Sequence, residues 1–359
     1  MTDPGPPPRG PASRASHHAG IWIGSYGGGL RALRHDADQW SLGACFAAAG
    51  NASFGTYSPR HDIHYIVDER DAGTVGFYRA VKCIGAQDAT PSWTCFARVA
   101  VGGDAPCHIA LDHSETRLAV ANYATGSVSL FRLSDDGLPA APADVFVHRG
   151  SGPNTERQSG PHAHWVGFDA DDRWLYAVDL GTDEILAFAT DAEAIDTPRI
   201  AYRAPAGSGP RHMVLHPRLP GIAYLANELT SALTLLSGGD GAFAARATMS
   251  TLPAGYDGPN IVAHIAMNAA CDRLYVSNRG HDSIAVFALD AAGAPTLIQH
   301  APAGAAYPRF FLIAQDHASL IVANEKDGCV TILPIESDGR LGASVATLPV
   351  AGAAFALFA

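Results

Sequence analysis

The stretch GSGPRHMVLHPRLPGIAYLANELTSALTLL, from Gly207 to Leu236, contains short apolar runs separated by turns rich in Gly, Pro, Asn and Ser. Its pattern is an apolar strand, a polar turn, a second strand that ends in Asn or Asp, and a third apolar strand. Weaker copies occur at five other places. Aligned on a Tyr or Leu in the second strand, the copies fall 45 to 58 residues apart, at Tyr65, Leu118, Tyr176, Tyr224, Tyr275 and Leu320. Strand repeats of roughly 40 to 50 residues are typical of a β-propeller.

The two ends of the chain supply one further repeat. IWIGSYGGGLRAL, from Ile21 to Leu33, matches a second and a third strand without an inner strand before them. AGAAFALFA, from Ala351 to Ala359, reads as one strand with no second strand after it. Pairing the two segments leaves no open sheet edge in the ring. The sequence therefore predicts an all-β fold, a single seven-bladed β-propeller over residues 20–359, closed by the C-terminal strand joining the N-terminal blade.

The N-terminal segment predicts no folded structure and no export signal. Residues 1–19 are rich in Pro, Gly and Ser and lack the apolar core of a secretory signal, so we expect a disordered tail. No apolar run in the chain approaches the length of a membrane-spanning helix. The six cysteines form no CxxC pair and are too sparse for a disulfide scaffold. We therefore expect reduced thiols and a cytoplasmic protein.

The charge of the chain limits its partners. The formal net charge is -11, and no run of Lys or Arg interrupts it, which argues against nucleic acid as a partner. We also expect no membrane partner, and we expect a monomer because a closed ring needs no second subunit. A small anionic substrate would require a local basic pocket.

The spacing of polar residues predicts such a pocket. Consecutive inner and second strands are antiparallel, so residues equidistant from the turn between them are neighbours. The pairs predicted in this way are Arg211 with Glu228, His162 with Asp179, His264 with Arg279, and Arg309 with Glu325. All lie at the same end of their repeats. We expect one funnel that is lined by His162, His164, Arg211, His212, Glu228, His264, Arg279 and Arg309.

Several chemistries remain open for this funnel. Buried cations cost desolvation free energy unless an anion offsets it, and a ligand is one candidate. The alternative is structural, with the histidines bonding between blades and Arg211 pairing with Glu228. His162 and His164 have the spacing for one face of a metal site, but a third ligand is not evident, so we predict no metal and no cofactor. No GxSxG motif supports a serine nucleophile, and Cys107 beside His108 is more consistent with packing.

At these residues the chain resembles the seven-bladed β-propeller lactonase family, which includes propeller-type 6-phosphogluconolactonases and fungal carboxy-cis,cis-muconate lactonizing enzymes. The resemblance runs from about Ile21 to the C-terminus and is carried by the elements PHAH, GPRH, NEL and SNRG. It implies a catalytic cluster, which maps onto His162, Arg211, Glu228 and Arg279.

The resemblance implies hydrolysis of a sugar lactone, with 6-phosphogluconolactone favoured, by metal-independent general acid/base catalysis. Either His162 or Glu228 is the base. The predicted substrate-binding residues are His164, His212, His264, Arg309 and Lys326. The first alternative is a carboxy-cis,cis-muconate cycloisomerase, which runs related chemistry in the direction of lactone formation. The second is a non-enzymatic interaction propeller, although no repeat carries the Trp-Asp pair of that class.

Overall fold

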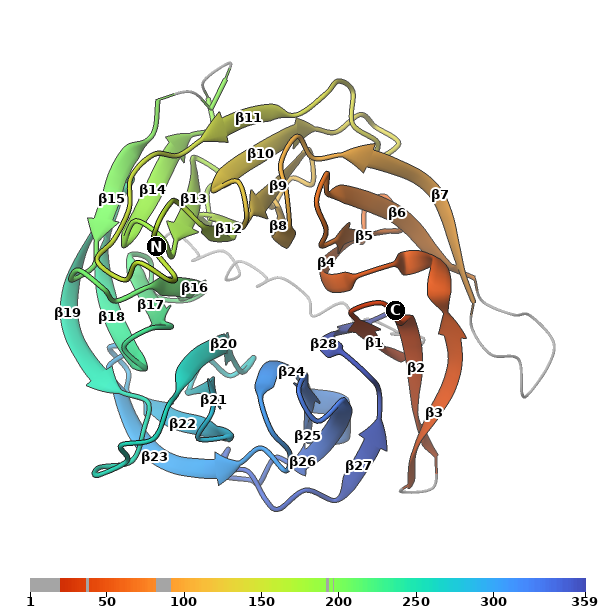
Figure 1. Cartoon of the computed structure of the whole chain (residues 1–359), viewed down its shortest axis with the longest axis vertical. Coiled ribbons are helices and arrows are strands. Elements are labelled where there is room, and N and C mark those ends of the chain that lie inside the picture. Colours follow the sequence, from red (N-terminus) through yellow and green to blue (C-terminus); the bar gives the residue numbers. More distant parts are fainter. Residues whose placement is uncertain (1–19, 37–38, 82–91, 192–193, 196) are drawn as a thin grey trace, which may run out of the picture.

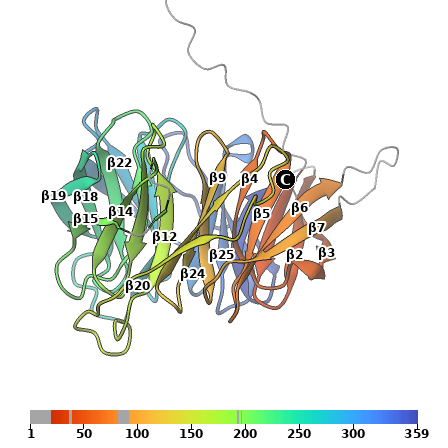
Figure 2. The ribbon, with the colours of Figure 1, turned by 90° about the horizontal axis from the view of Figure 1, so that it is seen from above.

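The chain forms a ring of seven four-stranded antiparallel sheets around a central axis (Figure 1). The computed structural model describes residues 20–36, 39–81, 92–191, 194–195 and 197–359. The predicted tail, residues 1–19, lies outside the described residues. The predicted all-β, seven-bladed propeller is confirmed. Seen from the side in Figure 2, the blades stand next to one another around a flat ring.

In every blade the four strands follow one another from the axis outward. Blade 1 contains β28 (Ala353–Phe358), β1 (Ile21–Ser25), β2 (Gly29–Asp36) and β3 (Gln39–Phe46). Blade 2 contains β4 (Ala52–Ser58), β5 (Ile63–Asp68), β6 (Thr74–Val81) and β7 (Ser92–Ala100). Blade 3 contains β8 (Pro106–Leu111), β9 (Arg117–Asn122), β10 (Ser127–Arg132) and β11 (Asp144–Val147). Blade 4 contains β12 (Ala163–Phe168), β13 (Trp174–Asp179), β14 (Glu184–Ala189) and β15 (Arg199–Arg203).

The remaining blades have the same arrangement. Blade 5 contains β16 (Pro210–Leu215), β17 (Ile222–Asn227), β18 (Ala232–Gly239) and β19 (Ala242–Ser250). Blade 6 contains β20 (Ile261–Met267), β21 (Arg273–Arg279), β22 (Ser283–Leu289) and β23 (Pro295–Pro302). Blade 7 contains β24 (Pro308–Ala314), β25 (Ser319–Asn324), β26 (Cys329–Pro334) and β27 (Ala346–Pro349). Two short 3-10 helices are η1 (Ala47–Ala49) and η2 (Gln315–His317).

Burial explains why the inner strands of each repeat are easier to recognise in the sequence than the outermost one. The second and third strands lie between neighbouring blades, so both faces are covered and nearly every residue is buried, as in β25 and β26. The outermost strands have one face in solvent and alternate, as in β11 and β27. An alternating strand of four residues has a weak apolar signal.

Tyrosines of the repeat join several neighbouring blades. Within the described residues, buried apolar side chains form clusters that each combine strands of adjacent blades. The tyrosine hydroxyls donate to backbone oxygens in the outer turn of the following blade, from Tyr65 to Gly137 (2.9 Å), Tyr224 to Gly293 (2.6 Å) and Tyr275 to Gly339 (2.8 Å). The repeat is therefore stabilised between blades as well as within them.

Ring closure occurs as the sequence predicts. β28 pairs with β1 in antiparallel register, with Ile21 opposite Phe358. Ala353 and Phe355 are buried in a cluster that also contains residues of blades 2 and 7. None of the helical segments in the described ranges is long and apolar enough to cross a membrane.

Candidate active site

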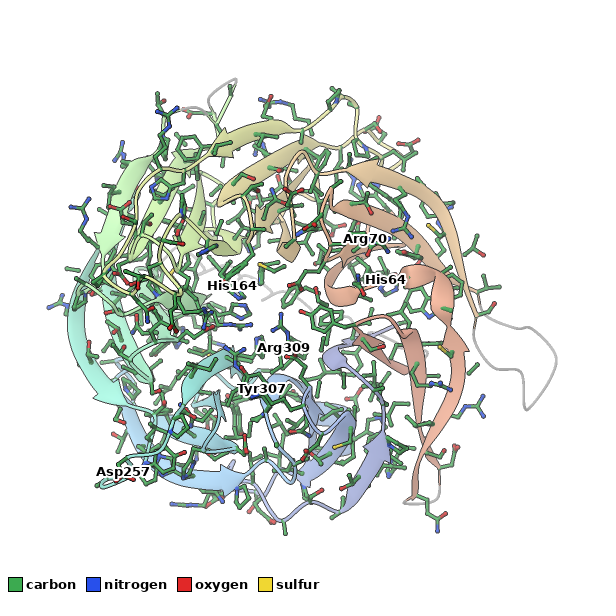
Figure 3. All side chains as sticks on the ribbon, viewed as in Figure 1. His64, Arg70, His164, Asp257, Tyr307 and Arg309 are labelled. Atoms are coloured by element: carbon green, nitrogen blue, oxygen red, sulfur yellow. The ribbon has the colours of Figure 1, made fainter. Side chains whose placement is uncertain are left out.

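Every innermost strand carries a β-bulge near its beginning, at one end of the ring. The bulges fall at Ser53 and Phe54, Cys107, His164, Arg211, Ala263 and His264, Arg309, and Ala354. A bulge interrupts the alternation of side chains and redirects one of them. As a result Arg211 and His212, adjacent in sequence, lie side by side, with Nη1 and Nε2 3.2 Å apart. Figure 3 shows His164 and Arg309 near the centre of the ring.

The strand register corrects one predicted pairing. Arg211 and Glu228 are in contact, and the backbone N–H of His162 donates to Asp179 Oδ1 at 2.8 Å, as expected from their spacing. The predicted pairing of His264 with Arg279 is wrong, because the register set at the turn places Ile265 opposite Val276 and His264 beside Ser277, whose Oγ accepts from His264 N at 2.9 Å. Arg279 lies opposite Ile261. The side chain of Arg279 is nevertheless at the same end of the ring, where it contacts Glu228.

Glu228 is the centre of the polar cluster at this end, which we call the funnel. It follows β17, and its carboxylate is 1% exposed. Oε2 lies 3.0 Å from Arg211 Nε and accepts a hydrogen bond of 2.8 Å from Arg279 Nη2. Oε1 accepts a hydrogen bond of 2.5 Å from Arg157 Nη2. Burial would raise the pKa of Glu228, but the three guanidiniums together lower it, so the carboxylate is ionised at neutral pH.

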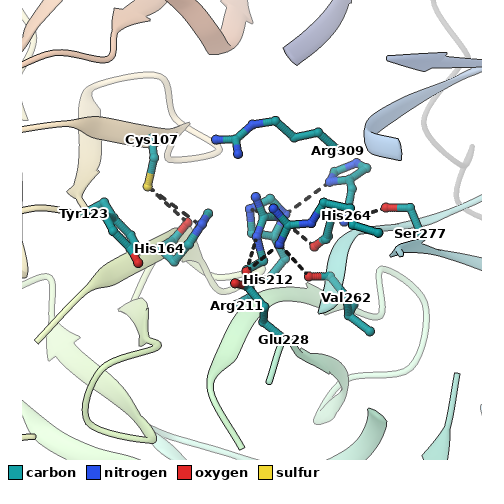
Figure 4. Close-up of polar contacts among 12 residues, drawn as sticks. Cys107, Tyr123, His164, Arg211, His212, Glu228, Val262, His264, Ser277 and Arg309 are labelled. Carbon is teal, nitrogen blue, oxygen red and sulfur yellow. Dashed lines mark hydrogen bonds and ion pairs between the residues drawn. The ribbon is translucent and has the colours of Figure 1, made fainter. Parts of the chain in front are cut away.

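Arg211 and Arg279 are fixed in place by backbone oxygens. Arg211 Nη1 donates to Ala263 O at 2.7 Å, and Arg279 Nη2 donates to Val262 O at 3.0 Å (Figure 4). Burial and repulsion by Arg279 lower the pKa of Arg211 to about 9, partly offset by Glu228. That value is above neutral, so Arg211 carries its charge at neutral pH and can attract an anionic group.

His162 precedes β12 and is half-buried. Its ring stacks on Tyr123 with a centroid separation of 4.4 Å, and Nδ1 lies 2.9 Å from Tyr123 O. A carbonyl oxygen accepts only, so in the neutral ring Nδ1 carries the hydrogen and Nε2 keeps the lone pair. Tyr123 Oη in turn accepts from Arg157 Nη2 at 3.4 Å. His162 and Glu228 are therefore linked through Tyr123 and Arg157 at the same end of the ring.

Four further imidazoles pack together on the axis next to Arg211. The ring of His212 lies 5.2 to 5.4 Å from those of its three neighbours. His212 Nδ1 is also 3.2 Å from His264 Nδ1. Burial, followed by repulsion from charged or imidazole neighbours, lowers the pKa of all four rings well below the ordinary value, and that of His264 to about 3. These neutral rings are His108, His164, His212 and His264.

The predicted substrate-binding histidines thus lie in one packed group, and their role in binding remains a prediction. His164 and His212 are 6% and 4% exposed, close to the 3% and 5% of the Arg211 and Arg279 side chains. His264 is less buried and lines a cavity of about 570 Å³ that extends along β16 and β20 away from the bulges. His108, which the funnel prediction did not include, belongs to the same group.

Arg309 and Lys326 occupy the side of the funnel formed by blade 7. Arg309 Nη2 lies 3.6 Å from Glu69 Oε2, and its Nη1 lies 3.5 Å from Glu325 Oε2. The predicted neighbour Glu325 is therefore present, but a second carboxylate also offsets the charge of Arg309. Lys326 is exposed, with Nζ 3.9 Å from the ring centre of Tyr307, and Arg279 lies against the same ring at 5.1 Å.

Two other chemistries gain no support from the geometry. Burial raises the pKa of the Cys107 thiol, whose Sγ is 3.8 Å from His164 Nδ1, so this thiol is not an activated nucleophile. Among the residues that the structure describes, no group of three or more His, Cys, Asp or Glu side chains is placed to hold a metal ion.

Arg157 is the site residue that the sequence reasoning missed. It lies in the loop of residues 149–161 between β11 and β12, outside the strand repeat, so the symmetry that located the other residues could not locate it. The available signal was the unusually long polar segment GSGPNTERQSG directly before PHAH, with one arginine among its turn residues. Long loops in compact domains are often functional.

Comparison with known proteins places this chain in one family. Residues 20–358 match the family model described as Lactonase, 7-bladed beta-propeller. The chain therefore belongs to the seven-bladed β-propeller lactonase family, as its motifs predicted.

Named relatives extend over most of the chain. It is 28% identical over 340 residues to a 6-phosphogluconolactonase of Bacillus subtilis (strain 168), covering 92% of this chain and 95% of the relative. It is 32% identical over 301 residues to a 6-phosphogluconolactonase of Formosa agariphila, covering 79% and 80%. A solved structure described as a putative 6-phosphogluconolactonase from Bacteroides fragilis has a TM-score of 0.82 at 25% identity, covering 97% and 99%.

Proposed function

We propose that this protein hydrolyses the lactone of a sugar acid, and that its substrate is 6-phosphogluconolactone. The proposal is supported chiefly by one observation: an imidazole with its lone pair on Nε2 lies at the same end of the ring as a buried carboxylate held by three guanidiniums. Relatives of similar length that carry the name 6-phosphogluconolactonase support the choice of substrate.

In the proposed mechanism His162 is the general base. Nε2 removes a proton from water, and the water oxygen forms a bond to the lactone carbonyl carbon. Arg211 and Arg279 stabilise the negative charge that develops on the carbonyl oxygen. The ring C–O bond then breaks, and the imidazolium returns its proton to the departing ring oxygen. The product is the open-chain hydroxy acid, and each of these steps uses only side chains of this chain.

Glu228 has a different part in this proposal. Its lowered pKa and its three guanidinium partners make it a weak base at neutral pH. Its carboxylate instead holds Arg211 and Arg279 at the positions from which they reach the substrate. This division of roles favours His162 over Glu228 as the base, a choice that the spacing of the residues left open.

A substrate panel tests the proposal. Purified protein is assayed with 6-phosphogluconolactone, unphosphorylated gluconolactone and carboxy-cis,cis-muconate, each with and without EDTA. We expect hydrolysis of the phosphorylated lactone that EDTA does not change. Activity on carboxymuconate alone would favour the cycloisomerase alternative, no activity on any substrate would favour an interaction propeller, and loss of activity with EDTA would contradict the metal-independent mechanism.

The His162→Ala variant tests the assignment of the base. Removing the general base is expected to lower kcat by about 100- to 10,000-fold, while the half-buried position leaves the thermal unfolding temperature little changed. The matched control is His317→Ala, an exposed imidazole in η2 at the opposite end of blade 7. Equal rates in the His162→Ala variant and the wild type would refute the assignment.

We also propose that the protein acts in the cytoplasm. The cysteines within the described residues, Cys45, Cys95, Cys107, Cys271 and Cys329, are all free thiols, which suits a reducing compartment. Fractionation of cells that produce the full chain tests this location.

A further inference from the structure

The loop of residues 149–161 is built to hold one arginine over the funnel. Asn154 Oδ1 accepts hydrogen bonds of 3.1 Å from the backbone N–H groups of Glu156 and Arg157. Gln158 is fully buried, and its Nε2 donates to Leu180 O and to Asp183 Oδ1, both at 2.9 Å. Asn154 therefore fixes the backbone before Arg157 within the loop, and Gln158 anchors the residue after it to blade 4, while the Arg157 side chain extends toward Glu228 in blade 5.

Arg157 differs from the other two guanidiniums that contact Glu228. The side chains of Arg211 and Arg279 are 3% and 5% exposed, and both bind backbone oxygens of blade 6. The side chain of Arg157 is 33% exposed, and among the described residues its polar partners are Glu228 Oε1 and Tyr123 Oη. Arg157 can therefore move to a ligand without breaking the backbone contacts that fix the site.

The charges around Glu228 are unequal. Three guanidiniums face one carboxylate, which leaves two positive charges in excess at a site where two of the cations are buried. On the opposite side of the funnel Arg309 already has two carboxylate neighbours, Glu69 and Glu325. An entering anion is thus attracted to the side of Glu228, where Arg157 is the most exposed of the three guanidiniums.

We propose that Arg157 is a substrate-binding residue that exchanges Glu228 Oε1 for the phosphate group of a phosphorylated lactone. This inference rests on the proposed function and names the feature of the substrate that the funnel recognises. Guanidinium binds phosphate through two parallel hydrogen bonds, and the Tyr123 hydroxyl is within reach to add a third donor. The exchange also leaves Glu228 Oε1 available to a hydroxyl group of the sugar.

The test compares Arg157→Ala and Arg157→Lys with the wild type on two substrates. For Arg157→Ala we expect KM for 6-phosphogluconolactone to rise by about 10- to 100-fold, as for the loss of a charge-assisted contact, with Arg157→Lys intermediate. The KM for unphosphorylated gluconolactone should change by less than about threefold, because that lactone carries no group for Arg157 to bind. Arg173→Ala is the control, an ion-paired but exposed arginine that contacts Asp240.

Two results would overturn the inference. One is an equal loss of kcat on both lactones in Arg157→Ala, which indicates that Arg157 only positions Glu228. The other is an unchanged KM for the phosphorylated lactone. If the wild type hydrolyses neither lactone, the proposed function fails, and calorimetric titration with 6-phosphogluconate still decides the role of Arg157: binding by Arg157→Ala that is weaker by about tenfold or more supports it, and equal binding refutes it.

Discussion

A carboxylate buried as completely as that of Glu228 is unfavourable unless cations offset the loss of hydration. The offset comes from three separate parts of the chain, through Arg211 at the start of β16, Arg279 at the end of β21 and Arg157 in the loop before β12. The dependence is mutual, because Arg211 and Arg279 are themselves buried. The ion pairs that hold these side chains in the candidate site are therefore also the ones that stabilise the fold.

The Glu228→Gln variant tests this mutual dependence. The amide keeps the shape of the side chain but removes its charge, which leaves two buried guanidiniums uncompensated. We expect the free energy of unfolding to fall by about 3 to 5 kcal/mol, measured by chemical denaturation. The control is Asp240→Asn, in an exposed pair with Arg173, where the loss should stay below about 1 kcal/mol. Similar small losses in both variants would show that the buried pairs are not needed for stability.

The elements that deliver the site are the bulged inner strands and the turns before them. Gly209, in the turn before β16, has a left-handed φ of 57°. Its N–H donates to Asp183 Oδ1 at 2.7 Å, and its carbonyl oxygen accepts from Glu228 N at 2.6 Å. Asp183 also holds Gln158 and with it the Arg157 loop. A single turn thus sets the relative positions of Arg211, Glu228 and the loop.

Gly209→Ala is predicted to disturb this arrangement. A Cβ atom would lie 2.4 Å from Leu229 Cγ, in addition to the cost of a left-handed conformation for alanine. We expect a loss of at least about 1 to 2 kcal/mol in unfolding free energy and a fall of roughly tenfold or more in kcat/KM. Gly255→Ala is the matched control, because φ is 83° there and no atom lies within 4 Å of the added carbon.

Comparing these two glycine variants separates the effect of backbone strain from the effect of a displaced Glu228. Gly255→Ala should lose stability only because alanine is strained at a left-handed φ, and it should keep its activity. Full activity in Gly209→Ala, measured on the same lactone, would contradict the role of this turn in placing Glu228.

The whole ring encloses four neutral imidazoles, and this couples its stability to pH. Their pKa values are lowered in the folded protein, so below the unfolded value of about 6.5 the unfolded chain binds more protons than the folded one. The contribution of these four rings to the free energy of unfolding is therefore complete above about pH 6.5. It is lost as the pH falls toward the pKa values of the folded protein. Each ring contributes about 1.4 kcal/mol per pH unit in that range. The rings are those of His108, His164, His212 and His264.

Chemical denaturation between about pH 7.5 and pH 5 measures this effect, and His108→Phe isolates one ring. His108 lies against Phe54 with centroids 4.1 Å apart, so a phenyl ring suits its surroundings. The variant should lose stability less steeply on acidification, by about 1.4 kcal/mol per pH unit. His317→Ala, in exposed η2, should keep the wild-type slope, and a wild-type slope in His108→Phe would show that this imidazole is protonated in the folded state.

His148 contributes in the opposite direction. Burial lowers its pKa, but Nδ1 is 2.9 Å from Asp179 Oδ2 and Nε2 is 3.1 Å from Glu184 Oε2, and these carboxylates raise the pKa overall. Its stabilisation is therefore complete below the unfolded pKa and is lost as pH rises through the folded one. The slope measured for the wild type therefore includes an opposite contribution from His148.

The repeat, the closure of the ring and most of the site could be predicted from the amino-acid sequence. Apolar period and turn residues are local signals, so they predicted strands such as β17, and the motifs PHAH, GPRH, NEL and SNRG predicted His162, Arg211, Glu228 and Arg279. The lone inner strand at the C-terminus was sufficient to predict closure against β1, because an unpaired sheet edge is unfavourable.

Which charges meet in the funnel depends on the assembled ring. The register of β20 against β21 placed Arg279 opposite Ile261 and not His264, and the loop before β12 brought Arg157 to Glu228. The ring also packed His164 and His212 among other imidazoles and gave Arg309 a second carboxylate, Glu69. Bulges and contacts between blades depend on how seven sheets fit around one axis, and no local period in the sequence carries that information.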